Sequence, residues 1–171
     1  MDRQYTEAAK HYGFFCEGCE DNCCLTRFHH HTFLEYLCIS EGYNALASET
    51  REEVREKAEK VCEAVARADR ERVSTRIICP LNAEGLCILY AHRPMICRLH
   101  GISHELHQPD GKIIRGPGCE TFTRQAEGKK PFRFDRTPFY MEMAHLEREL
   151  KLAMGTKQRI RMTVAEIILS L

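Results

Sequence analysis

The spacing of hydrophobic residues predicts a long helix between Glu52 and Arg72. Within this stretch, apolar side chains recur at steps of three and four: Val54, Ala58, Val61, Val65 and Ala68. Such spacing places them in one stripe along a helix, the pattern of a surface helix that turns one face toward a core.

A second helix is predicted from about Thr32 to Leu46. Its expected buried side chains are Phe33, Leu34 and Leu37. The segment Ser48-Glu49-Thr50 is expected to cap the long helix that follows, because hydroxyl side chains accept hydrogen bonds from the first amides of a helix.

Two more helices are expected toward the C-terminus. Thr137 is a suitable cap, Pro138 suits the first turn and Gly155 suits the end, which predicts a helix from Thr137 to about Ala153. The segment Thr163-Val164-Ala165-Glu166 has the spacing of a capping box and predicts a short helix after Thr163.

The middle of the chain favours short strands. Two apolar runs, Arg76 to Leu81 and Gly85 to Tyr90, flank a polar turn and predict a small hairpin. Leu99 to His107 and Lys112 to Arg115 predict a second hairpin, because the Pro-Asp-Gly sequence between them strongly favours a turn.

These elements predict an α+β fold that is mainly α-helical, with two small β-hairpins around a cysteine-rich metal-binding centre. The length of 171 residues suits a single compact domain. We expect residues 16–120 to form the metal-binding core and residues 121–171 to form a helical C-terminal extension.

Composition narrows the classes of function. The 25 Lys and Arg residues are balanced by 25 Asp and Glu, so the chain lacks the basic excess that grips nucleic acid. Its apolar runs are far shorter than the roughly 20 residues of a membrane-spanning helix. The first residues lack the apolar segment of a signal peptide. We therefore expect a cytoplasmic protein that binds neither nucleic acid nor a membrane.

The ten cysteines are the strongest chemical signal in the sequence. Eight of them form two groups: Cys16, Cys19, Cys23 and Cys24, and then Cys79, Cys87, Cys97 and Cys119. In a reducing compartment, clustered cysteines more often bind metal or carry out redox chemistry than form structural disulfides.

The spacing within the first group favours metal binding. Cys16 and Cys19 are three positions apart, so both thiolates can reach one ion across a tight turn. Cys23 and Cys24 are adjacent, and consecutive side chains of an extended segment point to opposite faces. The pair most easily serves two different sites. Eight thiolates suit two four-thiolate sites, and the sequence leaves the partition open.

The remaining two cysteines fit a simpler role. Cys38 and Cys62 lie inside helical patterns, and we expect both to pack in the core as small hydrophobic side chains.

Basic residues accompany the second cysteine group. Arg93-Pro94 opens a short predicted helix that carries Cys97, and Arg98 follows directly. Such cations can offset the negative charge of a thiolate site and tune the reduction potential of an iron-sulfur cluster. The alternative is that these arginines are ordinary surface residues. The basic segment Arg124 to Arg136 is expected to be a solvated loop, with docking of a protein partner as the alternative.

The order of these motifs resembles the YkgJ-type family, a group of zinc- or iron-chelating proteins with a CxxCxxCC cysteine cluster. The resemblance covers residues 16 to 120 and rests on the first cysteine group, Cys79-Pro80-Leu81, Gly85 to Tyr90, Arg93 to Arg98 and Cys119. Three residues separate Cys19 from Cys23, where the family has two. The resemblance implies that all eight cysteines ligate metal, as an iron-sulfur cluster of 4Fe-4S type, as zinc, or as both.

Two functions follow from this chemistry. The first is an iron-sulfur protein in electron transfer or a cluster-dependent reaction, with an electron donor as partner. The second is a structural zinc module that mediates protein-protein interaction. Four thiolates suit zinc and iron-sulfur clusters alike. Whether the chain is an enzyme stays open: a flagellin lysine methylase has a similar cysteine motif, but no motif of a hydrolase or phosphate-binding enzyme is present.

Overall fold

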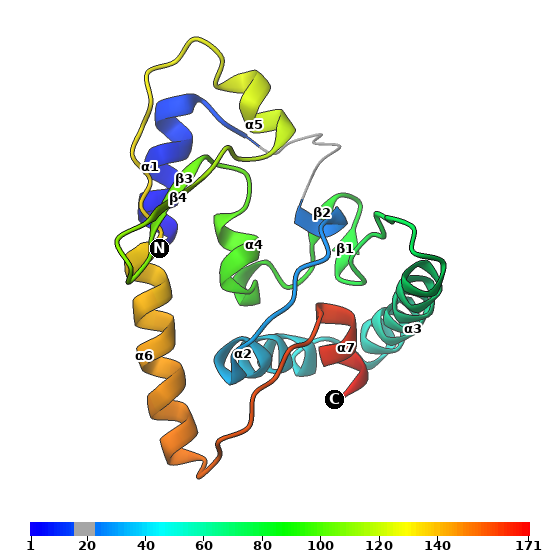
Figure 1. The fold of residues 1–171 in the computed structure, drawn as a ribbon. Coiled ribbons are helices and arrows are strands. Elements are labelled where there is room, and N and C mark those ends of the chain that lie inside the picture. The colour runs from blue at the N-terminus through cyan, green and yellow to red at the C-terminus, as the bar shows by residue number, and fades with distance from the viewer. Residues whose placement is uncertain (16–22) are drawn as a thin grey trace. The chain divides into compact units, whose positions relative to one another are not determined.

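The computed structural model describes residues 1–15 and 23–171 and is mainly α-helical, with two small antiparallel hairpins (Figure 1). The predicted α+β class is confirmed. The described chain divides into two compact units. Unit 1 comprises Met1–Cys23 and Cys97–Glu149, and unit 2 comprises Cys24–Ile96 and Leu150–Leu171. The predicted division at residue 120 stays a prediction.

Unit 1 contains short elements and most of one long helix. They are α1 (Asp2–Tyr12), β3 (His104–His107), β4 (Ile113–Gly116), α5 (Glu120–Gln125) and α6 (Thr137–Ala153), and α4 (Met95–Leu99) ends in this unit. β3 and β4 pair antiparallel, with His104 opposite Gly116 and His107 opposite Ile113. This hairpin was predicted, although its first strand begins five residues later than expected.

Aromatic rings hold the N-terminal segment of unit 1 against α5. The Phe122 ring lies 4.8 Å from the Tyr12 ring and 5.5 Å from the Phe14 ring, both in edge-on geometry. Such contacts add to the free energy gained from burying the rings.

The basic segment before α6 buries part of its side chains, which a solvated loop would leave in water. Phe134 is 2% exposed and its ring contacts Tyr5 and Phe139. Arg136 is also buried, and its guanidinium donates to the backbone carbonyls of Leu99 and Ile102. The predicted solvated loop is therefore wrong for this end of the segment, because ring burial and carbonyl acceptors replace contact with water.

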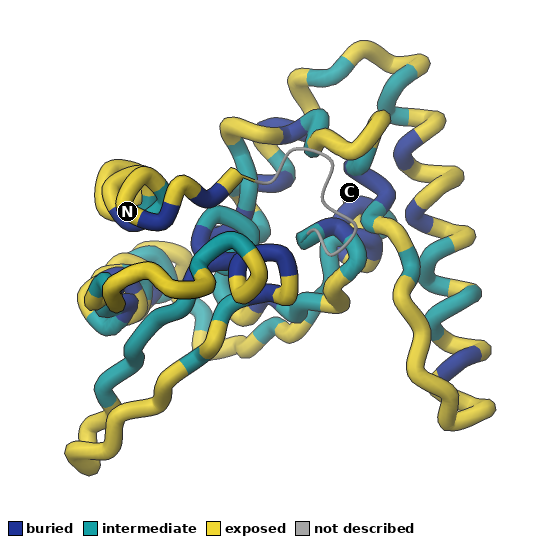
Figure 2. The backbone as a smooth tube through the Cα atoms, turned by 90° about the horizontal axis from the view of Figure 1, so that it is seen from above, coloured by how far each residue is buried: buried dark blue, intermediate teal, exposed yellow. Residues whose placement is uncertain are grey.

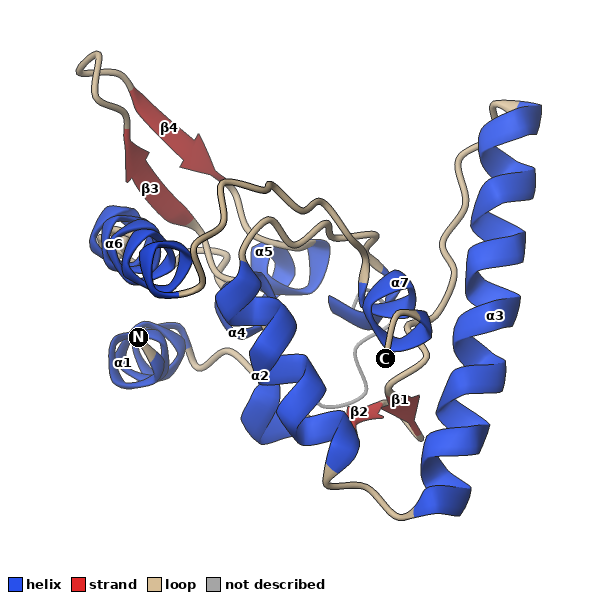
Figure 3. Ribbon diagram, turned by 90° about the horizontal axis from the view of Figure 1, so that it is seen from below, coloured by secondary structure: helices blue, strands red, loops and turns tan. Residues whose placement is uncertain are grey.

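Unit 2 contains the longest helix and the smaller hairpin. Its elements are α2 (Phe33–Asn44), α3 (Ser48–Glu71), β1 (Asn82–Ala83), β2 (Leu86–Cys87), η2 (Tyr90–His92) and α7 (Val164–Leu169), with η1 (Cys23–Leu25) at its start. α7 packs against both α2 and α3, so the C-terminal residues belong to the core of this unit (Figure 3).

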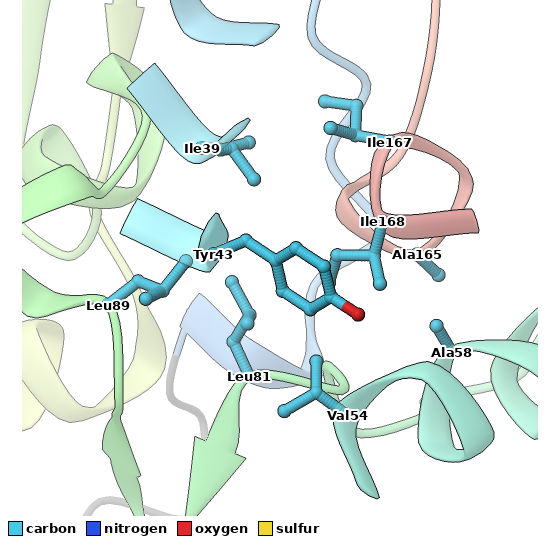
Figure 4. Packing of buried hydrophobic residues seen from close by; sticks show 9 residues of the cluster. All are labelled: Ile39, Tyr43, Val54, Ala58, Leu81, Leu89, Ala165, Ile167 and Ile168. Carbon is cyan, nitrogen blue, oxygen red and sulfur yellow. The ribbon is translucent and has the colours of Figure 1, made fainter. Parts of the chain in front are cut away.

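One hydrophobic core joins α2, α3 and α7 to the segments that flank the small hairpin. Figure 4 shows its nine buried residues: Ile39, Tyr43, Val54, Ala58, Leu81, Leu89, Ala165, Ile167 and Ile168. The predicted stripe of α3 supplies Val54 and Ala58, and its buried positions recur along one side of the helix (Figure 2). Leu81 and Leu89 are the two core residues that flank the small hairpin.

Most helix ends match the capping signals in the sequence. α6 spans Thr137–Ala153 as predicted, and the Thr163–Glu166 capping box is present at the start of α7. The predicted cap at Ser48-Glu49-Thr50 is wrong: these residues form the first turn of α3, and Ala47 precedes them without a side-chain cap.

The small hairpin is tighter than predicted. β1 occupies Asn82 and Ala83, which the sequence places in the turn, and the turn shrinks to Glu84 and Gly85. Both turn residues have positive φ, 51° and 86°, which matches the twist of two-residue hairpin turns.

The predicted buried face of α2 is wrong. Phe33 and Leu34 are half-buried and Leu37 is 45% exposed. The helix instead buries Glu35, Ile39, Gly42 and Tyr43. Ile39 and Tyr43 join the core, and Gly42 allows close packing on His92, because a Cβ atom there would lie 2.6 Å from the His92 ring.

Glu35 is buried at the start of α2 and collects several hydrogen-bond donors. Its carboxylate accepts from the Thr32 hydroxyl at 2.9 Å and from the Met95 amide at 3.2 Å, and His30 Nδ1 lies 3.6 Å away. Burial alone would raise the pKa of Glu35, but His30, Thr32 and the Met95 amide outweigh it and hold the pKa below its ordinary value.

We predict that Glu35→Gln destabilises the protein by about 1–3 kcal/mol at neutral pH, since an amide nitrogen would face donors that now meet a carboxylate. Because the folded-state pKa of Glu35 is lowered, its contribution is complete above the ordinary value of 4.5 and is lost as the pH falls through the lowered pKa. Urea denaturation of both proteins over this pH range measures the difference.

Glu53→Gln, at an exposed position of α3, is the matched control and should change stability little at any pH. A constant difference between wild type and Glu35→Gln as the solution is acidified would contradict the assignment of a buried, ionised Glu35.

Candidate metal centre

The six described cysteines among the eight predicted ligands divide between the two units. Cys23, Cys97 and Cys119 belong to unit 1, and Cys24, Cys79 and Cys87 belong to unit 2. The boundary passes between the adjacent residues Cys23 and Cys24. Cys16 and Cys19 lie outside the described residues, so their predicted role stays a prediction.

A backbone hydrogen bond joins two of the cysteine segments of unit 2. The Cys79 amide donates to the Cys24 carbonyl at 2.8 Å, which fixes η1 beside the segment that leads into β1. The hairpin then places β2 next to β1, with Cys87 opposite Asn82. Three cysteines from distant parts of the sequence are therefore brought into one region of unit 2.

Cys79 and Cys87 occupy two similar turns that the core holds in place. Each cysteine is followed two residues later by a leucine of the core, Leu81 or Leu89, and these leucines are 2% and 3% exposed. The backbone amide of each leucine donates to the sulfur of its cysteine. The Ile88 amide also donates to the Leu81 carbonyl at 2.9 Å and links the two turns.

The environment of these sulfurs opposes ionisation when no metal is bound. Burial raises the pKa of the Cys79 thiol to about 12, against the opposing effect of the Leu81 amide and with a further rise from Cys24 and Cys87. Burial also raises the pKa of Cys87, where Cys24 acts in the same direction. The Cys24 sulfur therefore affects the pKa of both thiols in the same direction.

In unit 1, Cys119 is fixed by backbone contacts at the start of α5. Its sulfur accepts from the Phe122 amide at 3.3 Å, and its own amide donates to the Gly101 carbonyl at 2.9 Å. Gly118 has a φ of 90°, and a Cβ atom there would lie 2.4 Å from the Gly101 carbonyl oxygen. A glycine is therefore needed to bring Cys119 against this loop.

The short helix predicted to carry Cys97 is α4, which confirms its position after Arg93-Pro94. Arg98 donates to Asp2 at 3.1 Å in unit 1, so its charge has a carboxylate partner. Arg93 lies in unit 2, where its guanidinium stacks on the Tyr90 ring at 3.6 Å.

Cys38 and Cys62 have the environments expected of packing residues. Cys62 packs against the core of unit 2, and burial raises the pKa of its thiol. Cys38 is half-buried on α2, and its thiol donates to the His92 carbonyl at 3.6 Å.

The donor types suit a thiolate-ligated metal, but the described side chains do not converge on one point. Among residues 1–15 and 23–171, no group of three or more Cys, His, Asp and Glu side chains stands in a metal-holding arrangement. Sulfur donors with backbone N–H partners are nevertheless the environment that zinc and iron-sulfur centres use. Cys24, Cys79 and Cys87 fit such a centre by their chemistry and by the segments that carry them.

The two Cys-x-Leu turns are a feature that the sequence reasoning missed. Cys79-Pro80-Leu81 and Cys87-Ile88-Leu89 share the same spacing, and this repetition was visible in the sequence. In the structure, each turn has a core leucine whose backbone amide acts on the cysteine sulfur. This arrangement could not be foreseen, because it depends on the hairpin between the two turns.

Comparison with known proteins identifies no relative: no family model, no curated protein and no solved structure matches the chain. In the part of the chain that the structure describes, no helix is both long and apolar enough to cross a membrane.

We predict that Cys79→Ser lowers the thermal unfolding midpoint of protein purified under anaerobic conditions more than Cys62→Ser does. Metal ligands that join separate segments stabilise the folded chain, whereas a half-buried packing thiol contributes little. Differential scanning calorimetry with and without a strong chelator measures the effect. Chelation should remove most of the difference between the two variants, and an equal difference in its presence would contradict a metal role for Cys79.

Proposed function

We propose that the protein is a metal-binding cysteine-cluster protein that holds an iron-sulfur cluster, zinc, or both. The ligands are the six cysteines described above together with Cys16 and Cys19. The observation that carries this proposal is the way the cysteine segments of unit 2 are joined. The Cys79 amide donates to the Cys24 carbonyl, the hairpin pairs β2 and its Cys87 with β1, and the Leu81 and Leu89 amides act on the sulfurs of Cys79 and Cys87.

The raised pKa values of Cys79 and Cys87 argue against a role for these thiols as free nucleophiles. A thiol with a pKa of about 12 stays protonated at neutral pH, and a protonated thiol is a poor nucleophile. Cys79 is therefore poorly suited to nucleophilic chemistry on its own. A bound metal ion displaces the thiol proton and balances the charge of the resulting thiolate. This gives a chemical reason for placing several cysteines in one buried region.

When bound, an iron-sulfur cluster would supply one-electron transfer, and zinc would supply a structural cross-link. In either case the residues of the chain act in the same way: the cysteines donate sulfur, the Leu81 and Leu89 amides stabilise negative charge on sulfur, and the core fixes the two turns. The resemblance to the YkgJ-type family is consistent with both metals.

The proposed metal site also suggests a cellular compartment and a class of protein partner. A cytoplasmic location suits clustered thiols, since a reducing compartment keeps them available for metal. An iron-sulfur protein would exchange electrons with a donor protein, and a zinc module would present its helices to a protein partner. The proposal includes no role for nucleic acid, in line with the even balance of charge.

Metal and acid-labile sulfide analysis, combined with a visible spectrum of anaerobically purified protein, tests the proposal. Iron with equivalent sulfide and a chromophore bleached by dithionite identifies a cluster, and a colourless protein with about two zinc ions identifies the zinc form. We expect Cys87→Ser to reduce the bound metal and Cys62→Ser to retain it. Protein that holds no metal, either as purified or after reconstitution with iron and sulfide or with zinc, would overturn the proposal.

A further inference from the structure

The segment of unit 2 between α6 and α7 carries basic residues at alternating positions. Residues 156–161 form no helix or strand and lead to the capping box of α7 (Figure 1). Lys157, Arg159 and Arg161 are exposed, whereas Met162 packs against the hydrophobic core. Successive side chains of an extended segment lie on opposite faces. One face of this segment is therefore basic, and the other is directed toward the core.

A second segment of unit 2 pairs with this one and adds histidines to the basic face. The His30 amide donates to the Met162 carbonyl at 2.7 Å, and the Met162 amide donates to the His30 carbonyl at 3.0 Å, as in an antiparallel bridge. His30 is 1% exposed, whereas its neighbour His31 is exposed and its neighbour His29 is half-buried. The Arg161 guanidinium donates to His29 Nδ1 at 3.4 Å. The two segments therefore present their basic side chains on one shared face.

Positive charge dominates this face. In the part of the chain that the structure describes, no carboxylate forms an ion pair with Lys157, Arg159 or Arg161. Burial is the largest cause that holds the pKa of His29 below its ordinary value, and the charge of Arg161 acts in the same direction. The carboxylate of Glu166 opposes them, but it is engaged by the amide and hydroxyl of the capping box. The face therefore suits a partner that brings negative charge.

The backbone of the same segment has an unpaired edge. Met162 directs both of its backbone groups toward His30, and such groups alternate between the two edges of an extended chain, so those of Arg161 face the opposite edge. Within residues 1–15 and 23–171, the backbone groups of Arg159, Ile160 and Arg161 have no hydrogen-bond partner. An edge of this kind can pair with one more extended strand.

We propose that this basic edge, defined as Lys157, Arg159 and Arg161 with His29 and His31, is a docking surface for an acidic, extended segment of a protein partner. The partner pairs its backbone with the unpaired edge, and its Asp or Glu side chains meet the basic face. This inference goes beyond the proposed metal binding and requires no metal at the cysteines.

Two observations favour a protein over a nucleic acid as the occupant. The edge presents carbonyl acceptors as well as amide donors, and a peptide backbone matches both, whereas a phosphate only accepts hydrogen bonds. The 25 basic residues of the chain are also balanced by 25 acidic ones, so the charge that favours an anion is confined to this edge.

Fluorescence anisotropy with a short labelled peptide of alternating Glu and Thr residues tests the proposal, since Thr favours extended backbone. We expect saturable binding to the wild type that weakens as salt is added. The double variant Arg159→Gln/Arg161→Gln should bind about tenfold more weakly, because two ion pairs with the peptide are lost.

The double variant Arg55→Gln/Lys57→Gln is the matched control. It removes the same charge from exposed positions of α3 in the same unit and should keep the affinity of the wild type. A second peptide of alternating Glu and Pro keeps the acidic charge but lacks half of the backbone amides, so it should bind more weakly than the Glu-Thr peptide. A single-stranded oligonucleotide should also bind more weakly.

Far-ultraviolet circular dichroism establishes that each variant is folded. Absence of saturable binding of the Glu-Thr peptide to the wild type, or an equal loss of affinity in both double variants, would overturn the docking surface. Equal affinity for the Glu-Pro peptide would contradict pairing along the backbone edge. Tighter binding of the oligonucleotide than of either peptide would replace the protein partner with a nucleic acid and so overturn the proposal.

Discussion

A buried thiolate is unstable unless its negative charge is balanced, and this constraint governs the region of unit 2 that joins the segments of Cys24, Cys79 and Cys87. Without a metal, burial keeps the Cys79 thiol protonated at neutral pH. The Leu81 and Leu89 amides nevertheless act in the opposite direction and lower the pKa of the Cys79 and Cys87 thiols. These partners stabilise ionised sulfur, the form that the proposed metal would require.

The core of unit 2 and the proposed metal site depend on the same turns. Leu81 and Leu89 pack with residues of α2, α3 and α7, while their amides donate to the sulfurs of Cys79 and Cys87. Metal binding at these sulfurs would therefore restrain the hairpin that the core already holds. Conversely, disruption of the core would move the sulfurs, which couples stability to metal affinity in this unit.

The sequence predicts the positions of helices well, but it predicts poorly which residues distant in sequence come into contact. Helices with a regular stripe or a clear cap, such as α3, α6 and α7, lie where expected, because their signals come from residues within one or two turns. The buried face of α2 was wrong, because Glu35 is stabilised by Met95, a residue distant in sequence. The stacking of Arg93 on Tyr90 also depends on the turn at η2, which the sequence did not indicate. The sequence supplies eight candidate ligands, but the division of the six described ones between the two units requires the fold.

The central claim is that the eight clustered thiols hold metal and the two helical ones do not. Alkylation of the anaerobically purified protein, with each cysteine followed by mass spectrometry before and after metal removal, tests it most directly. The account predicts that the eight are protected while metal is bound and become reactive after its removal, and that Cys38 and Cys62 react at rates that change much less. Equal labelling of the eight cysteines in both states would contradict the account.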